Sequence, residues 1–152
     1  MEVLHPRCAG LDVHAANVVA CVRITSGRSV TYQHRPVSTT TRGLLELADW
    51  LTAHSVTHVA MEATGVYWKP VWHVLEDAFT LILANAMHIR NIPGRKNDKN
   101  DATWIADWLA CGLIRSSFVP PAPIQGLRDL TRTRKQLVRE ITRHTQRRAA
   151  LL

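Results

Sequence analysis

The sequence has few cysteines, no long apolar run and no secretory leader pattern. Its three cysteines, Cys8, Cys21 and Cys111, form no CxxC pair, so they indicate neither a disulfide framework nor a zinc knuckle. No apolar stretch reaches the roughly 18 residues of a membrane span, and the N-terminal residues lack a signal-peptide pattern. These absences argue against a membrane span and a secretory route. We expect a cytoplasmic protein with reduced thiols.

Basic residues outnumber acidic ones only in the second part of the chain. Positions 1–89 hold six Lys and Arg against seven Asp and Glu, whereas positions 90–152 hold thirteen against five. A nearly neutral part followed by a strongly basic one indicates a polyanionic partner, most simply nucleic acid. The alternative is a basic helix face that is only solvated. Because 46% of the residues are hydrophobic, the chain can bury a core, which excludes wholesale disorder.

The first part of the chain alternates between strand and helix signals. Three short apolar or β-branched segments, separated by turn residues, predict an antiparallel meander. The predicted strands are 8–13, 17–24, 29–37, 58–61 and 79–84, and the predicted helices begin near 41 and at 66. The order β-β-β-α-β-α-β is the one used by ribonuclease H-like nucleases. We therefore expect an α/β fold: a mixed sheet of three antiparallel strands and then parallel strands, flanked by helices.

After residue 84 the sequence becomes basic and is interrupted by proline and glycine. Residues 85–97 read as a polar loop, and a helix is predicted from Asp98 to about Cys111, closed by Gly112. Prolines predict a stiff linker over 118–123. A long basic helix with an imperfect apolar heptad follows.

These signals divide the chain into two predicted parts. A catalytic, ribonuclease H-like domain is expected at 1–117, and a linker with the start of a coiled-coil-like helix at 118–152. Because the helical pattern stops without a cap at Leu152, we expect a longer reading frame.

Four acidic residues stand where they could share one site. Asp12 lies at the end of the first predicted strand and Glu62 follows the fourth, at the edge where open α/β sheets place their sites. Asp98 and Asp101 are three apart, so on a helix they share a face. Taken singly, these are ordinary strand-end acids or helix-start acids favoured by the dipole. If all four converge, divalent cations must neutralise them, and Mg²⁺ or Mn²⁺ suits such oxygen ligands. Two such ions could support phosphodiester chemistry.

Basic residues lie beside these acids in the sequence and again along the last predicted helix. We expect them to hold a phosphate backbone. The candidate nucleic-acid-binding residues are Arg90, Arg95, Lys96, Lys99, Arg128, Arg132, Arg134, Lys135 and Arg139.

Three blocks in this order resemble the DEDD transposases of bacterial insertion sequences. They are GLDVH at 10–14, MEATGVYW at 61–68 and RKNDKNDA at 95–102. The likeness continues through LRDL and RTR within 127–134, which resemble the basic helix after the family's nuclease domain. The resemblance implies a RuvC-like catalytic domain that binds two Mg²⁺ ions, with Mn²⁺ as a substitute. Its catalytic and metal-binding acids would be Asp12, Glu62, Asp98 and Asp101.

The same resemblance implies an enzyme that acts on DNA. Members of the family move a DNA element by recombination, some with a structured guide RNA, and carry a C-terminal domain with a serine nucleophile. We therefore expect metal-dependent DNA strand cleavage and transfer by a homodimer or higher oligomer, in the bacterial cytoplasm near the nucleoid. Two alternatives are open: a truncated, non-catalytic module for nucleic-acid binding and dimerisation, and a stand-alone junction-type endonuclease.

Overall fold

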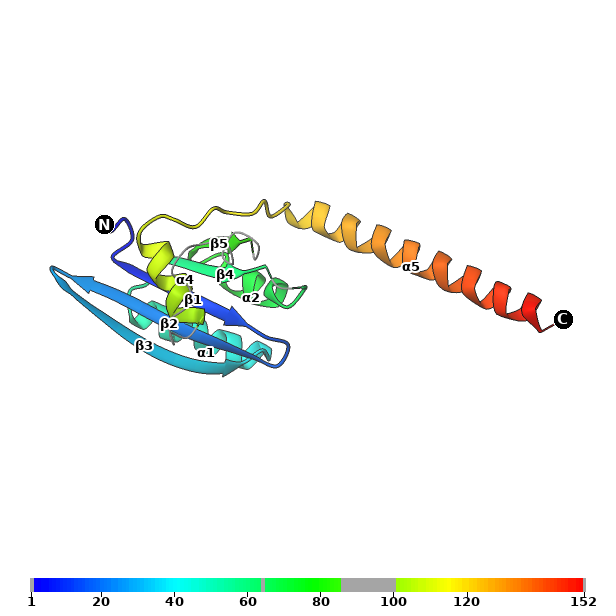
Figure 1. Ribbon diagram of the computed structural model, residues 1–152. Coiled ribbons are helices and arrows are strands. Elements are labelled where there is room, and N and C mark those ends of the chain that lie inside the picture. The colour runs from blue at the N-terminus through cyan, green and yellow to red at the C-terminus, as the bar shows by residue number, and fades with distance from the viewer. Residues whose placement is uncertain (1, 64, 86–100, 152) are drawn as a thin grey trace. The chain divides into compact units, whose positions relative to one another are not determined.

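The computed structural model describes residues 2–63, 65–85 and 101–151 of the chain (Figure 1). The chain divides into two compact units, Met1–Ser117 and Phe118–Leu152. None of the helices in the described ranges is long and apolar enough to cross a membrane.

The first unit is built on a five-stranded mixed sheet. Its strands are β1 (Arg7–Val13), β2 (Asn17–Ser26), β3 (Ser29–Ser38), β4 (His58–Glu62) and β5 (Thr80–Ala84). Their order across the sheet is β3-β2-β1-β4-β5. The first three are antiparallel, whereas β4 joins β1 and β5 joins β4 in parallel. The predicted meander followed by parallel strands is therefore confirmed.

Helices cover both faces of this sheet. They are α1 (Thr41–Ala53), α2 (Trp68–Leu75) and α4 (Asp101–Ala110). On β3, His34 contacts α4, while its neighbours Gln33 and Arg35 contact His54 and Trp50 at the end of α1. Because successive side chains of a strand point to opposite faces, α1 and α4 lie on opposite sides of the sheet. The helix α2 packs beside α1.

The core lies mostly between the sheet and the pair of helices α1 and α2. Leucines at helical spacing give α1 its buried face, as the sequence predicts. Fully buried side chains from these elements are Leu11, Val18, Val22, Leu44, Leu47, Leu51, Val59, Met61, Val71 and Leu75. The middle parts of the central strands β1 and β4 are buried on both faces, which explains why residues 8–11 and 59–61 are continuously apolar rather than alternating.

The helix α4 ends where the sequence predicts. Gly112 has a positive φ of 69°. Its N–H donates to Leu109 O at 2.9 Å, and the N–H of Leu113 donates to Trp108 O at 3.0 Å. This pair of bonds satisfies the last carbonyls of the helix, and glycine adopts the left-handed conformation without a Cβ penalty.

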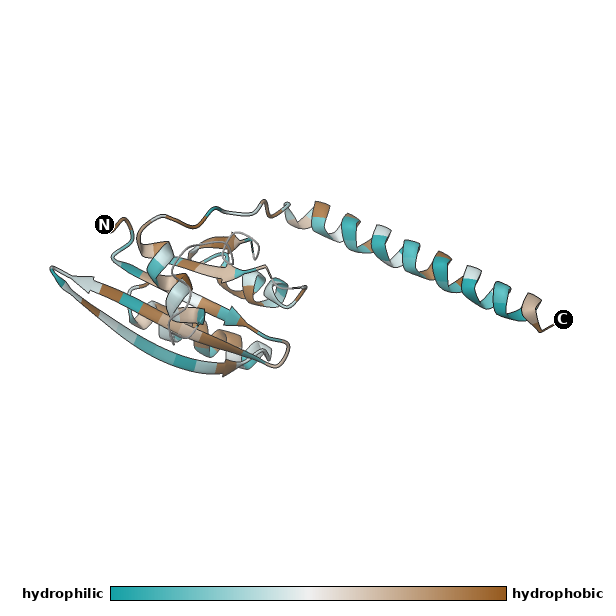
Figure 2. Cartoon of the chain, viewed as in Figure 1, coloured by the Kyte–Doolittle hydropathy of each residue, from teal (hydrophilic) through white to brown (hydrophobic). Residues whose placement is uncertain are grey.

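The second unit consists of a proline-containing segment and the helix α5 (Ala122–Ala150). The helix starts inside the predicted linker. A proline is tolerated in the first helical turn because the N–H groups at these positions have no partner within the helix. No residue of α5 is buried. Figure 2, coloured by residue hydropathy, shows mostly hydrophilic residues along this helix, with hydrophobic positions among them.

Candidate active site

Asp12 and Glu62 lie at the carboxyl ends of two neighbouring parallel strands. β1 and β4 pair in a register in which Leu11 lies opposite Met61. One further step along both strands brings Asp12 next to Glu62, the last residue of β4. Lateral neighbours in register share a face of the sheet, so both carboxylates lie on the face that α4 covers. The predicted neighbourhood of the first and fourth strands is confirmed.

The helix α4 runs antiparallel to β1, so its N-terminus lies toward the carboxyl ends of β1 and β4. Near its start, the backbone of Ala102 packs over Gly10, which precedes the first acid by two residues on that face. At its other end, Ala110 O accepts a hydrogen bond from Leu4 N at 2.8 Å, just before β1 begins. Asp101 opens α4 and therefore lies at the end of the helix that approaches the two strand-end carboxylates.

Part of the predicted site lies outside the described residues. This holds for the acid Asp98 and for the basic residues Arg90, Arg95, Lys96 and Lys99. Within the described ranges, no three His, Cys, Asp or Glu side chains are grouped closely enough to hold a metal ion. The structure thus brings together a carboxylate pair on the sheet and a helix start that approaches the same edge.

Asp12 has a histidine neighbour in the turn that follows β1. The Nε2 atom of His14 lies 3.0 Å from Asp12 Oδ2. The backbone of the turn holds the histidine in place, because His14 N donates to Asn17 O at 2.9 Å. The Asp12 side chain is 22% exposed, so a carboxylate oriented by His14 still reaches solvent at the edge of the sheet.

Gly10 allows α4 to lie directly on β1. A Cβ atom at this position would be 2.6 Å from Ala106 N and 3.0 Å from Ile105 Cβ, and closer still to Ala102 O. Because Cβ atoms essentially never approach other atoms so closely, only glycine permits this contact. The site therefore depends on a backbone-to-backbone approach two residues away from Asp12.

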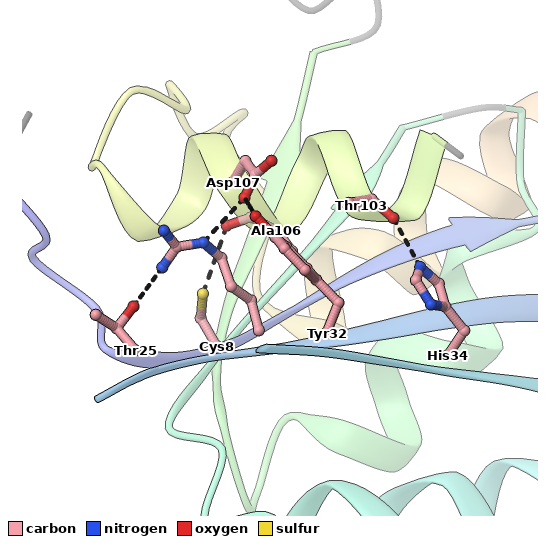
Figure 3. A network of polar contacts seen from close by, with 8 residues as sticks. Cys8, Thr25, Tyr32, His34, Thr103, Ala106 and Asp107 are labelled. Atoms are coloured by element: carbon pink, nitrogen blue, oxygen red, sulfur yellow. Dashed lines mark hydrogen bonds and ion pairs between the residues drawn. The ribbon is translucent and has the colours of Figure 1, made fainter. Parts of the chain in front are cut away.

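Polar side chains of β2 and β3 contact α4 on its side away from β4 (Figure 3). Asp107 Oδ1 accepts hydrogen bonds from Arg23 Nε at 2.9 Å and from Tyr32 Oη at 2.6 Å. A turn earlier on the helix, Thr103 Oγ1 lies 2.7 Å from His34 Nε2. We call these the anchoring contacts of α4. They join the helix to β2 and β3, on the side of β1 away from β4.

Burial and hydrogen bonding shift the pKa values of Arg23 and Tyr32 in this network. Burial lowers the pKa of Arg23, but hydrogen bonds with Asp107 and Tyr32 outweigh it, so the pKa lies above its ordinary value. Burial and the bond to Asp107 raise the pKa of Tyr32. Arg23 is only 7% exposed, and a charge so enclosed requires a partner. The ion pair with Asp107 supplies it.

Our reading of the sequence missed the anchoring contacts, although one signal for them is present. Arg23 interrupts the apolar run NVVACVRI of β2 on the same face as Val19 and Cys21. A cation on a buried strand face calls for an acid from another element. The sequence alone could not identify that acid as Asp107.

The fold is that of a ribonuclease H-like domain, as in RuvC. The structure of Thermus thermophilus RuvC covers 73% of this chain and 99% of its own, with a TM-score of 0.51 and 14% identity. T. thermophilus RuvC in complex with a Holliday junction substrate covers 74% of this chain and 100% of its own, with a TM-score of 0.53 and 14% identity. At such identities the likeness establishes the fold.

The family follows from the sequence match. A model of IS110-type DEDD transposases, described as transposase, matches residues 9–152, and the chain belongs to this family. It is 29% identical to the pilin gene-inverting protein of Moraxella lacunata over 111 residues. This aligned segment covers 64% of the present chain. The matched segment covers 32% of that protein, so the chain spans about a third of the length of this curated relative.

Proposed function

We propose that this chain is the catalytic domain of a DEDD transposase and that it cleaves and transfers DNA strands with bound divalent metal ions. The observation that supports the proposal best is the juxtaposition of Asp12 and Glu62 on neighbouring strands, beneath the helix that Asp101 opens. Membership in the transposase family and the RuvC fold support the same reaction class.

The residues at this edge suit a hard divalent cation. Asp12, Glu62 and Asp101 offer carboxylate oxygens, the ligands that Mg²⁺ and Mn²⁺ prefer. Asp98 would complete the set, with Mg²⁺ as the physiological ion at two positions. When bound, such ions activate the attacking oxygen and stabilise the leaving one. The chain's own part is to hold the carboxylates at one edge, with His14 orienting Asp12 through a 3.0 Å contact.

The helix α5 offers a second surface for the DNA backbone. Five exposed basic residues follow one another at spacings of four, three, four and four, which places them on one helix face. This basic stripe consists of Arg128, Arg132, Lys135, Arg139 and Arg143. It extends over about 22 Å of the helix. Arg134 lies instead in line with the exposed apolar residues of α5, among them Leu130, Leu137 and Ile141.

The partners follow from the same assignment. DNA is the substrate, because T. thermophilus RuvC was solved with a Holliday junction and the family moves DNA. A structured guide RNA and assembly into a homodimer or higher oligomer are part of the proposal. We also propose that the protein is associated with the nucleoid in the bacterial cytoplasm. The exposed apolar residues of α5 are consistent with assembly, since a helix of this length seldom leaves such residues uncovered.

A nicking assay tests the proposal with this chain. Purified protein is incubated with supercoiled plasmid and with branched oligonucleotide DNA, with Mg²⁺, Mn²⁺ or EDTA. Asp12→Asn should abolish metal-dependent nicking while the circular dichroism spectrum and the melting temperature stay near those of the wild type. Asp49→Asn, an exposed acid on α1 at the opposite face of the sheet, is the matched control and should nick normally.

The other outcomes separate the alternatives. Unchanged nicking by Asp12→Asn would refute the catalytic assignment. DNA binding without nicking by the wild type would favour the non-catalytic module. Cleavage confined to branched DNA, with no strand transfer, would favour a junction-type endonuclease.

A further inference from the structure

The anchoring contacts match the spacing of a helix to that of a strand. Thr103 and Asp107 are four residues apart on α4, a separation of about 6 Å along the helix axis. Their partners His34 and Tyr32 are two residues apart on β3, a separation of about 6.7 Å along the strand. Because both pairs form at once, the contacts determine the position of α4 along its axis as well as its rotation.

The apolar contacts of α4 determine its axial position less strictly. On the side of β4, Ile105 and Leu109 pack with Cys8 and Ala60. Beneath the helix lies Gly10, which faces the small residues Ala102 and Ala106 of α4. Small apolar residues offer few features that would distinguish one axial position from another, whereas hydrogen bonds are directional.

The buried Arg23 disfavours a shift of α4 by a whole turn. Its guanidinium donates to Asp107 Oδ1 at 2.9 Å and to Thr25 Oγ1 at 2.6 Å. If α4 shifted by one turn, Asp107 would leave Arg23 and the cation would be enclosed without its acid. Breaking a buried ion pair is far more costly than losing an apolar contact of similar area.

We propose that Tyr32 and Thr103 are positioning residues for the metal site: within the register that the Arg23–Asp107 pair sets, they fix the axial position and rotation of α4. They thereby direct the helix start at Asp101 toward the strand ends that carry Asp12 and Glu62. The inference rests on the metal site proposed above. Tyr32 contacts Asp107 and Thr103 contacts His34, so each of these contacts joins α4 to β3. Arg23 and Asp107 provide the charge pair around which the two neutral contacts are arranged.

The test compares variants of the same residues in the complete chain. The double variant Tyr32→Phe/Thr103→Val removes both hydroxyls, preserves side-chain shape and leaves the Arg23–Asp107 pair intact. Thr103→Ser retains the hydroxyl and serves as the conservative rescue. Ile105→Val removes one methyl group from the apolar side of α4 and is the control for a purely structural loss.

Mn²⁺ alone is the probe, and electron paramagnetic resonance of the free ion reports its binding. The double variant should bind Mn²⁺ about tenfold more weakly than the wild type, the size of effect seen when groups that orient metal ligands are removed. Thr103→Ser and Ile105→Val should bind like the wild type, even where Ile105→Val lowers the melting temperature as much as the double variant. If the double variant does not fold, Thr103→Val is compared with Thr103→Ser.

The possible failures are distinguishable. Equal Mn²⁺ affinity in the wild type and the double variant would overturn the positioning role and leave the metal site standing. Equal weakening in Ile105→Val would show that α4 acts only through its stability, which also overturns the inference. No Mn²⁺ binding by the wild type, or unchanged binding by Asp12→Asn, would overturn the metal site itself and the positioning role with it.

Discussion

Replacing Gly10 by alanine tests how closely α4 must lie on β1. The added Cβ would be 2.6 Å from Ala106 N and nearer still to Ala102 O, both of them backbone atoms of a helix. Restoring ordinary van der Waals distances requires α4 to retreat by about 1 Å. Neither helix nor strand can relieve the overlap by a rotamer change.

The expected cost is that of an overpacked core. Forcing an extra methyl group into a close-packed contact costs about 1–3 kcal/mol, and the retreat of α4 also stretches its bonds to Tyr32 and His34. The lower conformational entropy of alanine in the unfolded chain returns only about 0.5–1 kcal/mol. We expect a net loss of about 2 kcal/mol and a fall in Tm of roughly 6–10 °C.

Urea and thermal unfolding, followed by tryptophan fluorescence, measure this loss. Trp104 and Trp108 stack on α4 with ring centroids 5.8 Å apart, so they report on this helix. The same substitution at Gly126 is the control, because a Cβ there meets nothing within 4 Å. Gly126→Ala should instead stabilise α5 by about 0.5–1 kcal/mol. A Gly10→Ala protein as stable as the wild type would refute the close approach of α4 to β1.

Two further predictions concern charge. Replacing Arg132, Lys135 and Arg139 of the basic stripe by glutamine should reduce the slope of log affinity for duplex DNA against log salt by about 2.7, at 0.9 per lost phosphate contact. Fluorescence anisotropy measures this, and an equal change in an Arg134→Gln/Arg148→Gln control would contradict a special role for the stripe. Burial raises the pKa of the Cys8 thiol from 9.0 to about 12. Between these values the unfolded thiol ionises first, so stability should fall as pH rises, by about 1.4 kcal/mol per unit from this group. Urea unfolding between pH 8 and 10.5 should show a shallower decline in Cys8→Ala, and parallel declines would contradict the burial argument.

Local sequence patterns are enough to predict the order of the elements and the positions of two acids. Alternation and β-branched residues identified the strands of the meander, and leucine spacing identified α1, because both patterns are local consequences of backbone geometry. Asp12 and Glu62 stood out because each interrupts an apolar strand at its end. The expectation that their strands are neighbours followed from the β-β-β-α-β-α-β order, and the structure confirms it.

The way in which α4 is held over these strand ends depends on contacts between distant parts of the chain. Arg23 and Asp107 are 84 residues apart, and the local sequence around either residue does not identify the other as its partner. Gly10 reads in the sequence as an ordinary strand glycine, and the need for it appears once Ala102 and Ala106 lie against it. Such contacts depend on which face of a helix meets which strand and at what distance. A sequence pattern specifies that a face is buried, whereas the partner and the register come from close packing and from satisfying buried charge.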